Sequence, residues 1–152
     1  MQKFNFESVN MPDHFIRHAG FLGELAPRLG RVNDFAFMLT RRGEGLVAFR
    51  SASFPDRFLR HCNNRIRLDR PIGLDDERWL LDSTFYIERG LSDEKGFSFR
   101  SVNFPEMYLR HKDFHLVLDS PSRRDSFFRR DSTFLRWPAV TLIERRSVAM
   151  SA

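Results

Sequence analysis

The sequence predicts an all-β fold built from three similar units. Two observations predict it: one 13-residue phrase occurs three times, and short runs alternate apolar with polar residues. The phrase covers residues 6–18, 49–61 and 99–111, and its second and third copies agree at eight of 13 positions without a gap. Self-similarity of this kind is the signature of a repeat architecture.

A second, shorter phrase follows each copy of the first. It occurs as Asp34-Phe35-Ala36-Phe37, Asp82-Ser83-Thr84-Phe85 and Asp131-Ser132-Thr133-Phe134. The interval from the final His of the first phrase to this Asp is 16, 21 and 20 residues, and successive His residues are 43 and 50 residues apart. We therefore expect a single domain over residues 1–152, with repeats at approximately 1–45, 46–95 and 96–145.

The alternating runs indicate short, half-buried β-strands. Residues 65–68, 97–100 and 115–118 show the two-residue period of such strands, and helical spacing is not sustained anywhere. Turn-forming Pro, Gly and Asn residues separate the runs. About four strands per unit give twelve in all, and closure into a barrel removes exposed strand edges. The expected architecture is therefore a β-trefoil, with three pseudo-symmetric repeats of about four strands each.

Composition favours a folded domain that is held together by packing. Hydrophobic residues make up 41% of the 152 residues, and 17 of them are Phe, which has no polar group to keep at the surface. We interpret the Phe, Ser and Pro of the first phrase as core and turn residues, not as ligands. Cys62 is the only cysteine, so no internal disulfide is possible.

The chain is basic, and arginine carries the charge. Its formal net charge is +5, and 22 of the 25 basic residues are Arg. Paired arginines stand at 41–42, 123–124, 129–130 and 145–146, where they form either a solvated surface or, if they converge, an anion site. Basic residues are not interleaved with aromatics along one element, so we expect no nucleic-acid binding. No apolar stretch approaches 18 residues and no signal peptide is evident, so we expect no membrane insertion, and a chain either cytosolic or with its leader removed.

The two phrases together are similar to a known family. The pattern Phe-x-Ser-x-(Asn/Ser)-x-Pro-x-x-(Phe/Tyr)-(Leu/Ile)-Arg-His, followed by Asp-(Ser/Thr)-x-Phe, resembles the arabinofuranosidase B domain, carbohydrate-binding module family 42, over the whole chain. The resemblance implies a β-trefoil whose repeats can each hold an arabinofuranose residue in a shallow pocket. It also implies that the His and Asp of each repeat bond the sugar hydroxyls. The implied ligand-binding pairs are His61 with Asp82, His111 with Asp131, and His18 with Asp34.

The first repeat departs from this pattern. Its second phrase lacks Ser-Thr, and the interval from His18 to Asp34 is shorter than in the other repeats, so we expect its pocket to be reshaped or empty. The residues after the three His are Ala19, Cys62 and Lys112, which offer no aromatic ring for sugar stacking.

An imidazole and a carboxylate suit a polyol ligand, but they also suit a buried structural pair. A carboxylate accepts hydrogen bonds from two hydroxyls, and a neutral imidazole offers one donor and one acceptor. In a regular strand, however, His61 shares a face with Leu59. The imidazole is then buried and bonded to Asp82 simply to hold the fold. Both interpretations stay open at the level of the sequence.

Two functional classes remain. The first is a non-catalytic carbohydrate-binding domain for an arabinose-containing polysaccharide, which accompanies or derives from an arabinofuranosidase. The second is an arginine-rich trefoil interaction module that binds an anionic glycan or a protein partner. Salt separates them, because polyanion binding weakens steeply as salt rises. No phosphate-binding loop and no zinc-ligand spacing occur in the sequence, so we expect no cofactor and no metal site.

Overall fold

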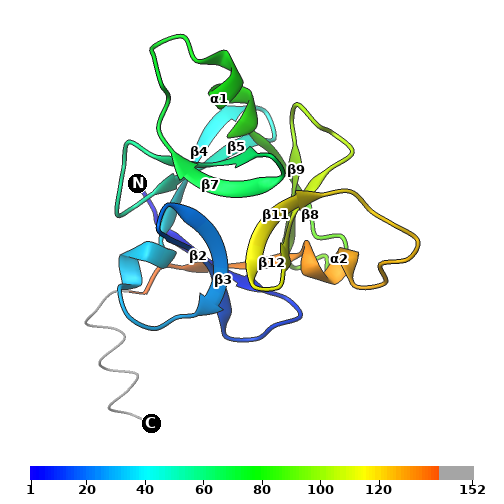
Figure 1. Ribbon diagram of the computed structural model, residues 1–152. Helices are drawn as coiled ribbons and strands as arrows, with labels where there is room; N and C mark the ends of the chain where they lie inside the picture. Colours follow the sequence, from blue (N-terminus) through cyan, green and yellow to red (C-terminus); the bar gives the residue numbers. More distant parts are fainter. Residues whose placement is uncertain (141–152) are drawn as a thin grey trace.

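Each of the three units forms four strands in the computed structural model, which describes residues 1–140 (Figure 1). The first unit contains β1 (Phe4–Ser8), β2 (His14–Ala19), β3 (Leu22–Pro27), the 3-10 turn η1 (Val32–Phe35) and β4 (Phe37–Gly43). The second contains β5 (Leu46–Ser51), β6 (Phe58–Cys62), β7 (Arg65–Asp69), α1 (Glu77–Asp82) and β8 (Phe85–Arg89). The third contains β9 (Phe97–Ser101), β10 (Tyr108–Lys112), β11 (His115–Asp119), α2 (Phe128–Asp131) and β12 (Phe134–Pro138). The expected end of the third repeat, residues 141–145, and the Arg145-Arg146 pair lie outside the described residues.

Six of the strands close a ring. β1 pairs with β4, β4 with β5, β5 with β8, β8 with β9 and β9 with β12. β12 then returns to β1 in antiparallel register, from Phe4 opposite Pro138 to Ser8 opposite Phe134. This closed barrel leaves no strand edge within the ring unpaired, and it confirms the β-trefoil that the repeats predict.

The other six strands form three hairpins that cap the barrel. The hairpins β2–β3, β6–β7 and β10–β11 pair with one another through β3, β7 and β11, and Figure 1 shows them around a common centre. The second residue of each tight turn has a positive φ and accepts a backbone hydrogen bond of 2.8 Å from the next hairpin. These acceptors are Phe21, Asn64 and Phe114, and the donors are Leu68, Leu118 and Leu25 respectively.

Phenylalanine from the first phrase occupies the centre of the barrel. Phe6, Phe49 and Phe99 stand at equivalent positions of the three repeats and are fully buried. Their ring centroids lie 5.3 Å apart for Phe6 and Phe49, 4.7 Å for Phe49 and Phe99, and 5.9 Å for Phe6 and Phe99, all edge to face. Edge-to-face pairs of this kind are favoured by the ring quadrupole. The aromatic-rich composition therefore serves the core, as the sequence predicts.

Under the hairpin cap, the repetition is broken at one position. Ile66 and Leu116 are equivalent residues of the second and third hairpins, and the first hairpin has Gly23 there. A Cβ atom at Gly23 would lie 3.0 Å from Cγ2 of Ile66 and 3.2 Å from Cδ1 of Leu116. The space on the pseudo-threefold axis therefore holds the branched side chains of the second and third repeats, and the first repeat contributes only backbone.

In the second and third repeats, a short helix ends at the first residue of the second phrase. The sequence analysis predicted only strands and missed these helices. α1 begins after Asp76, whose side chain accepts a 3.0 Å hydrogen bond from the Trp79 backbone N–H, and it ends at Asp82. α2 ends in the same way at Asp131. These segments are too short to show a helical period in the sequence. Within residues 1–140, no helix has the length and apolar character that a membrane span requires.

Candidate functional site

His61 and Asp82 meet at the junction of β6 and α1. Strand β6 directs His61 inward at its C-terminal end, and α1 presents Asp82 from its last residue. The imidazole Nε2 lies 3.3 Å from Oδ1 of the carboxylate, and each residue is only 4% exposed. The second repeat thus brings its predicted pair together in a nearly buried position.

The next repeat completes this pair. Asn103, which follows β9, places its Oδ1 2.9 Å from His61 Nε2, and its Nδ2 donates to Asp82 Oδ1 at 2.8 Å. Ser101 donates from Oγ to the same Asn103 oxygen at 3.0 Å and accepts a 3.1 Å hydrogen bond from the Phe104 backbone N–H. The serine therefore stabilises the turn, as expected, and the turn places Asn103 against His61 and Asp82 of the preceding repeat.

Asn103 bridges the imidazole and the carboxylate through the two atoms of its amide group. Its NH₂ group donates to Asp82 Oδ1, so its carbonyl oxygen is the atom that faces His61. Because an amide oxygen only accepts, Nε2 of His61 is the donor in this contact.

Arg60 holds the other side of the carboxylate. Its Nη2 donates to Asp82 Oδ2 at 2.5 Å, and its Nε donates to the backbone oxygen of His61 at 2.9 Å. Nη1 also lies 3.6 Å from Oδ2 of Asp69. The Arg-His dipeptide of the first phrase therefore provides both an imidazole and the cation that orients Asp82.

The third repeat forms the same network with residues from the beginning of the chain. Asn10 places its Oδ1 2.8 Å from His111 Nε2, and its Nδ2 donates to Asp131 Oδ1 at 2.6 Å. The imidazole Nε2 and Asp131 Oδ1 are 3.5 Å apart, and Arg110 donates from Nη2 to Asp131 Oδ2. Ser8 lies 3.1 Å from His111 Nε2. The closure of β12 onto β1 makes this arrangement possible.

The first repeat has a looser version of the network. Ser53 takes the place of asparagine and donates to Asp34 Oδ1 at 2.9 Å, but His18 Nε2 is 3.7 Å from that oxygen. Arg17 Nη2 is 3.6 Å from Asp34 Oδ2. A serine hydroxyl is shorter than an asparagine amide, and Asp34 lies inside η1 instead of at a helix end. The predicted pair is thus adjacent but not bridged.

Burial keeps two of the imidazoles neutral. Loss of solvation lowers the pKa of His18, against the opposing effect of the Asp34 carboxylate. The pKa of His111 is lowered in the same way, with Asp131 opposing the shift and the positive charge of Arg110 adding to it. A neutral imidazole offers both a donor and an acceptor, as polyol recognition requires.

Cavities adjoin the first and second networks. The second is open to a cavity of about 580 Å³ lined by Arg60, His61, Asp82, Asn103, Phe104 and four further residues of repeat two. A cavity of about 510 Å³ beside the first network is lined by Asp34, Ser53 and Phe54, and His18 is not among its lining residues. Both lie in the size range of small-ligand sites. No group of three or more His, Cys, Asp or Glu suited to a metal occurs within residues 1–140.

Sequence reasoning found the imidazole and carboxylate of each network but missed the groups that join them. The asparagine or serine at the fifth position of the first phrase is a polar residue that recurs in all three copies, which was an available signal. Phe104 follows it, is 44% exposed, and has its ring centroid 5.2 Å from that of His61. The expectation that no aromatic adjoins the sites considered only the residue after each His, whereas this ring comes from the next repeat.

Comparisons with known proteins give a family and a fold. The model of the alpha-L-arabinofuranosidase B (ABFB) domain family matches residues 75–150. An arabinofuranosidase solved in complex with arabinofuranosyl-alpha-1,2-xylobiose superimposes with a TM-score of 0.80 at 18% identity, over 91% of this chain and 31% of that one. A GH54 α-L-arabinofuranosidase soaked with a cyclic sulfate inhibitor gives 0.79 at 19% identity over the same shares. This chain therefore spans about a third of those proteins.

A designed threefold-symmetric protein, ThreeFoil, is also similar in fold. Its TM-score is 0.67 at 8% identity, over 88% of this chain and 96% of that one. No curated protein sequence matches the chain. The structural neighbours support the trefoil architecture, which an unrelated designed sequence also adopts, so the fold alone does not determine the ligand.

Proposed function

The chain belongs to the alpha-L-arabinofuranosidase B domain family, and on that premise we propose that it binds arabinofuranose-type side chains of plant or microbial polysaccharides without catalysis. Family membership supports carbohydrate binding in general. The finer proposal assigns the sugar to the networks centred on His61 and Asp82 and on His111 and Asp131, with His18 and Asp34 as a weaker third site. We also infer that residues 1–152 act as one domain.

The second cavity carries this proposal. All four polar members of one network, Arg60, His61, Asp82 and Asn103, line a single hollow of about 580 Å³. A pair that served only to hold the fold needs no adjoining hollow. Although His61 and Asp82 are nearly buried, the cavity gives a small polyol access to them. This observation favours the ligand-binding interpretation over the structural one.

The network retains hydrogen-bonding capacity for a ligand. The two carboxylate oxygens of Asp82 provide about four acceptor positions, and the protein uses at most three of them, for Asn103, Arg60 and the 3.3 Å contact to His61. At least one position remains for a sugar hydroxyl. Such a bond to a carboxylate is charge-assisted, and it contributes about 1.5–3 kcal/mol.

Phe104 supplies an apolar wall to the same cavity. Its ring stands edge to face with His61 at the cavity boundary. A furanose ring has a C–H face as well as hydroxyls, so an exposed aromatic beside a polar cluster fits both. Met11 takes the place of this aromatic beside the third network, and Phe54 does so beside the first. The second site is therefore the best formed.

The arrangement supports binding and not hydrolysis. Glycosidases use two carboxyl groups that flank one glycosidic bond. Among the described residues that line the second cavity, Asp82 is the only carboxylate, and it is already paired with Arg60. We expect weak binding at each site, with a Kd of about 1 mM, and avidity when several repeats engage one branched polysaccharide.

Titration with arabinofuranosyl oligosaccharides tests this function. We expect binding in the unaltered chain and its loss in the double variant Asp82→Ala/Asp131→Ala. Circular dichroism establishes that the variant is folded, since removal of either carboxylate also breaks a buried ion pair with an arginine. A folded double variant that binds with unchanged affinity would contradict the assignment.

A further inference from the structure

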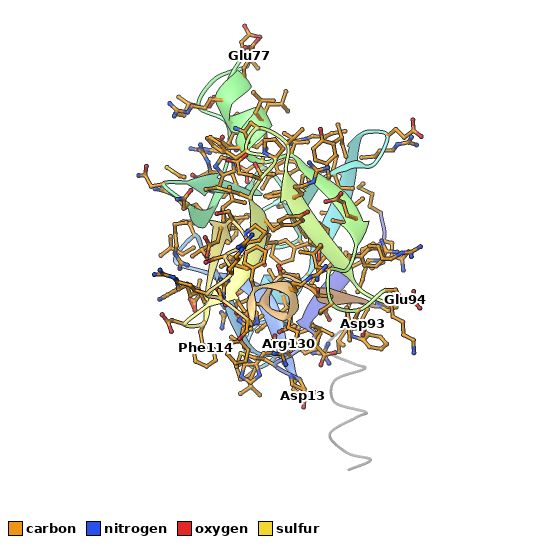
Figure 2. All side chains as sticks on the ribbon, turned by 90° about the vertical axis from the view of Figure 1, so that its right-hand side faces the viewer. Asp13, Glu77, Asp93, Glu94, Phe114 and Arg130 are labelled. Carbon is orange, nitrogen blue, oxygen red and sulfur yellow. The ribbon has the colours of Figure 1, made fainter. Side chains whose placement is uncertain are left out.

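Beside α2 lies a hollow that belongs to none of the three networks. It has a volume of about 480 Å³, and its lining includes Tyr108, Phe128, Ser122, Asp125, Arg123 and Arg129. Figure 2 faces this side of the molecule, where α2 and the labelled Arg130 lie toward the viewer, while Glu77 at α1 lies at the far end. The aromatic rings of Tyr108 and Phe128 pack edge to face 6.1 Å apart and form an apolar wall.

Two arginines at this hollow have no ionic partner within residues 1–140. Arg123 and Arg129 are exposed, and neither forms an ion pair or a side-chain hydrogen bond there. Asp125 is the carboxylate at the hollow, but Arg110 donates to it from Nη1 at 2.5 Å. That hydrogen bond lowers the pKa of Asp125, which stays ionised and engaged. The hollow therefore has two cations available to an incoming anion.

The fold does not require these arginines. Counting back from the site Asp of each repeat, Arg123 and Arg129 correspond to Leu74 and Leu80, and Phe128 corresponds to Trp79. The second repeat has a hollow of about 300 Å³ at the same place, lined by Leu74, Trp79 and Leu80. Two leucines suffice to form it, and acidic residues 75–77 line it instead of cations. The positive charge is thus particular to the third repeat.

We propose that the hollow beside α2 binds an acidic sugar, a carboxylate-bearing uronic acid residue, through Arg123 and Arg129. A guanidinium group matches a planar carboxylate with two parallel hydrogen bonds. The hydroxyl of Ser122 adds a polar contact for sugar hydroxyls, and the Tyr108 ring faces the C–H side of the sugar. Burial raises the pKa of Tyr108, so its phenol stays protonated. This site is additional to the neutral-sugar networks and recognises a different chemistry.

The test is a titration of the full chain with a glucuronic-acid-bearing xylo-oligosaccharide. Its matched control ligand is the same oligosaccharide with the carboxyl group reduced to an alcohol. We expect chemical-shift changes at residues 123–129 with the acid only, and an affinity that falls as salt rises. The variant Arg123→Gln/Arg129→Gln should lose about tenfold or more in affinity, because charge-assisted hydrogen bonds are lost.

A charge-matched variant controls for net charge. Arg41→Gln/Arg89→Gln removes two exposed arginines from other strands, and we expect its affinity for the acid to stay within about twofold. Equal binding of the reduced oligosaccharide, or an equal loss in both double variants, would overturn the proposal. Tighter binding of a sulfated oligosaccharide would overturn its assignment to a carboxylate.

The result is separable from the arabinofuranose sites. Asp82→Ala should leave uronate binding intact, and Arg123→Gln/Arg129→Gln should leave arabinofuranosyl binding at the second site intact. Asp82 is the proper choice for this comparison because Asp131 shares Arg110 with Asp125.

Discussion

Truncation of Asn103 to alanine should disable the site of the preceding repeat. The change removes the 2.9 Å contact to His61 and the 2.8 Å hydrogen bond to Asp82. One of these bonds is neutral and the other is made to a carboxylate, so we expect a loss of about 2–4 kcal/mol in the free energy of unfolding. The imidazole and carboxylate are no longer held in register, and the second-site affinity for arabinofuranosyl oligosaccharide should fall by about tenfold or more.

Amide NMR titration resolves the sites in this experiment. The turn residues Asn63 and Asn64 line the second cavity and report on it, whereas Asp113 and Phe114 occupy the equivalent turn of the third repeat. The matched variant Asn10→Ala should lower the affinity of the third site and leave the affinity of the second unchanged. If Asn103→Ala leaves the second site at full affinity, or weakens both sites equally, the assignment of each network to two adjoining repeats is wrong.

Three further predictions concern stability. His18 and His111 have pKa values below the ordinary 6.5, so below pH 6.5 the unfolded chain binds more protons than the folded chain. As the pH falls from 6.5 toward the folded-state pKa values, the free energy of unfolding should decrease by up to about 1.4 kcal/mol per pH unit for each imidazole. Urea denaturation from pH 7.5 to 5 measures this decrease, and a free energy that does not change with pH contradicts the prediction. Gly23→Ala should cost about 1–3 kcal/mol by overpacking, whereas Gly73→Ala, with open space around its Cβ position, should not destabilise the chain in the same urea assay. Phe49→Ala should cost about 3–5 kcal/mol because it leaves a cavity in the aromatic centre, and a shift in thermal midpoint of only a degree or two would argue against that packing.

The sequence predicts the fold well because the repeated residues carry out repeated structural tasks. Phe6, Phe49 and Phe99 recur because each fills one third of the same core, and alternation reveals the strands around them. The need for glycine at position 23 could not be predicted, because it arises from the close approach of Ile66 and Leu116, which belong to the other two hairpins. The short helices were missed because one or two turns are too few to show a period.

The candidate site was predictable only in part. His61 and Asp82 belong to one repeat, so their recurrence and spacing make them candidates in the sequence. Asn103 and Phe104 join them from the next repeat, and a pattern read within one repeat does not show that transfer. These residues come together only because consecutive repeats are neighbours in the closed ring, and that arrangement is a property of the tertiary structure.

The return of β12 to β1 distinguishes the third network from the second. His61 and Asn103 are 42 positions apart in the sequence, whereas the equivalent His111 and Asn10 are 101 apart. The second network is therefore formed by residues 60–103 alone, whereas the third joins residues near the two ends of the β-trefoil. Under the proposed function, a sugar held between Asn10 and Asp131 would link the two ends of the closed ring and should oppose fraying where β12 meets β1. A sugar bound at the second network should have no such effect.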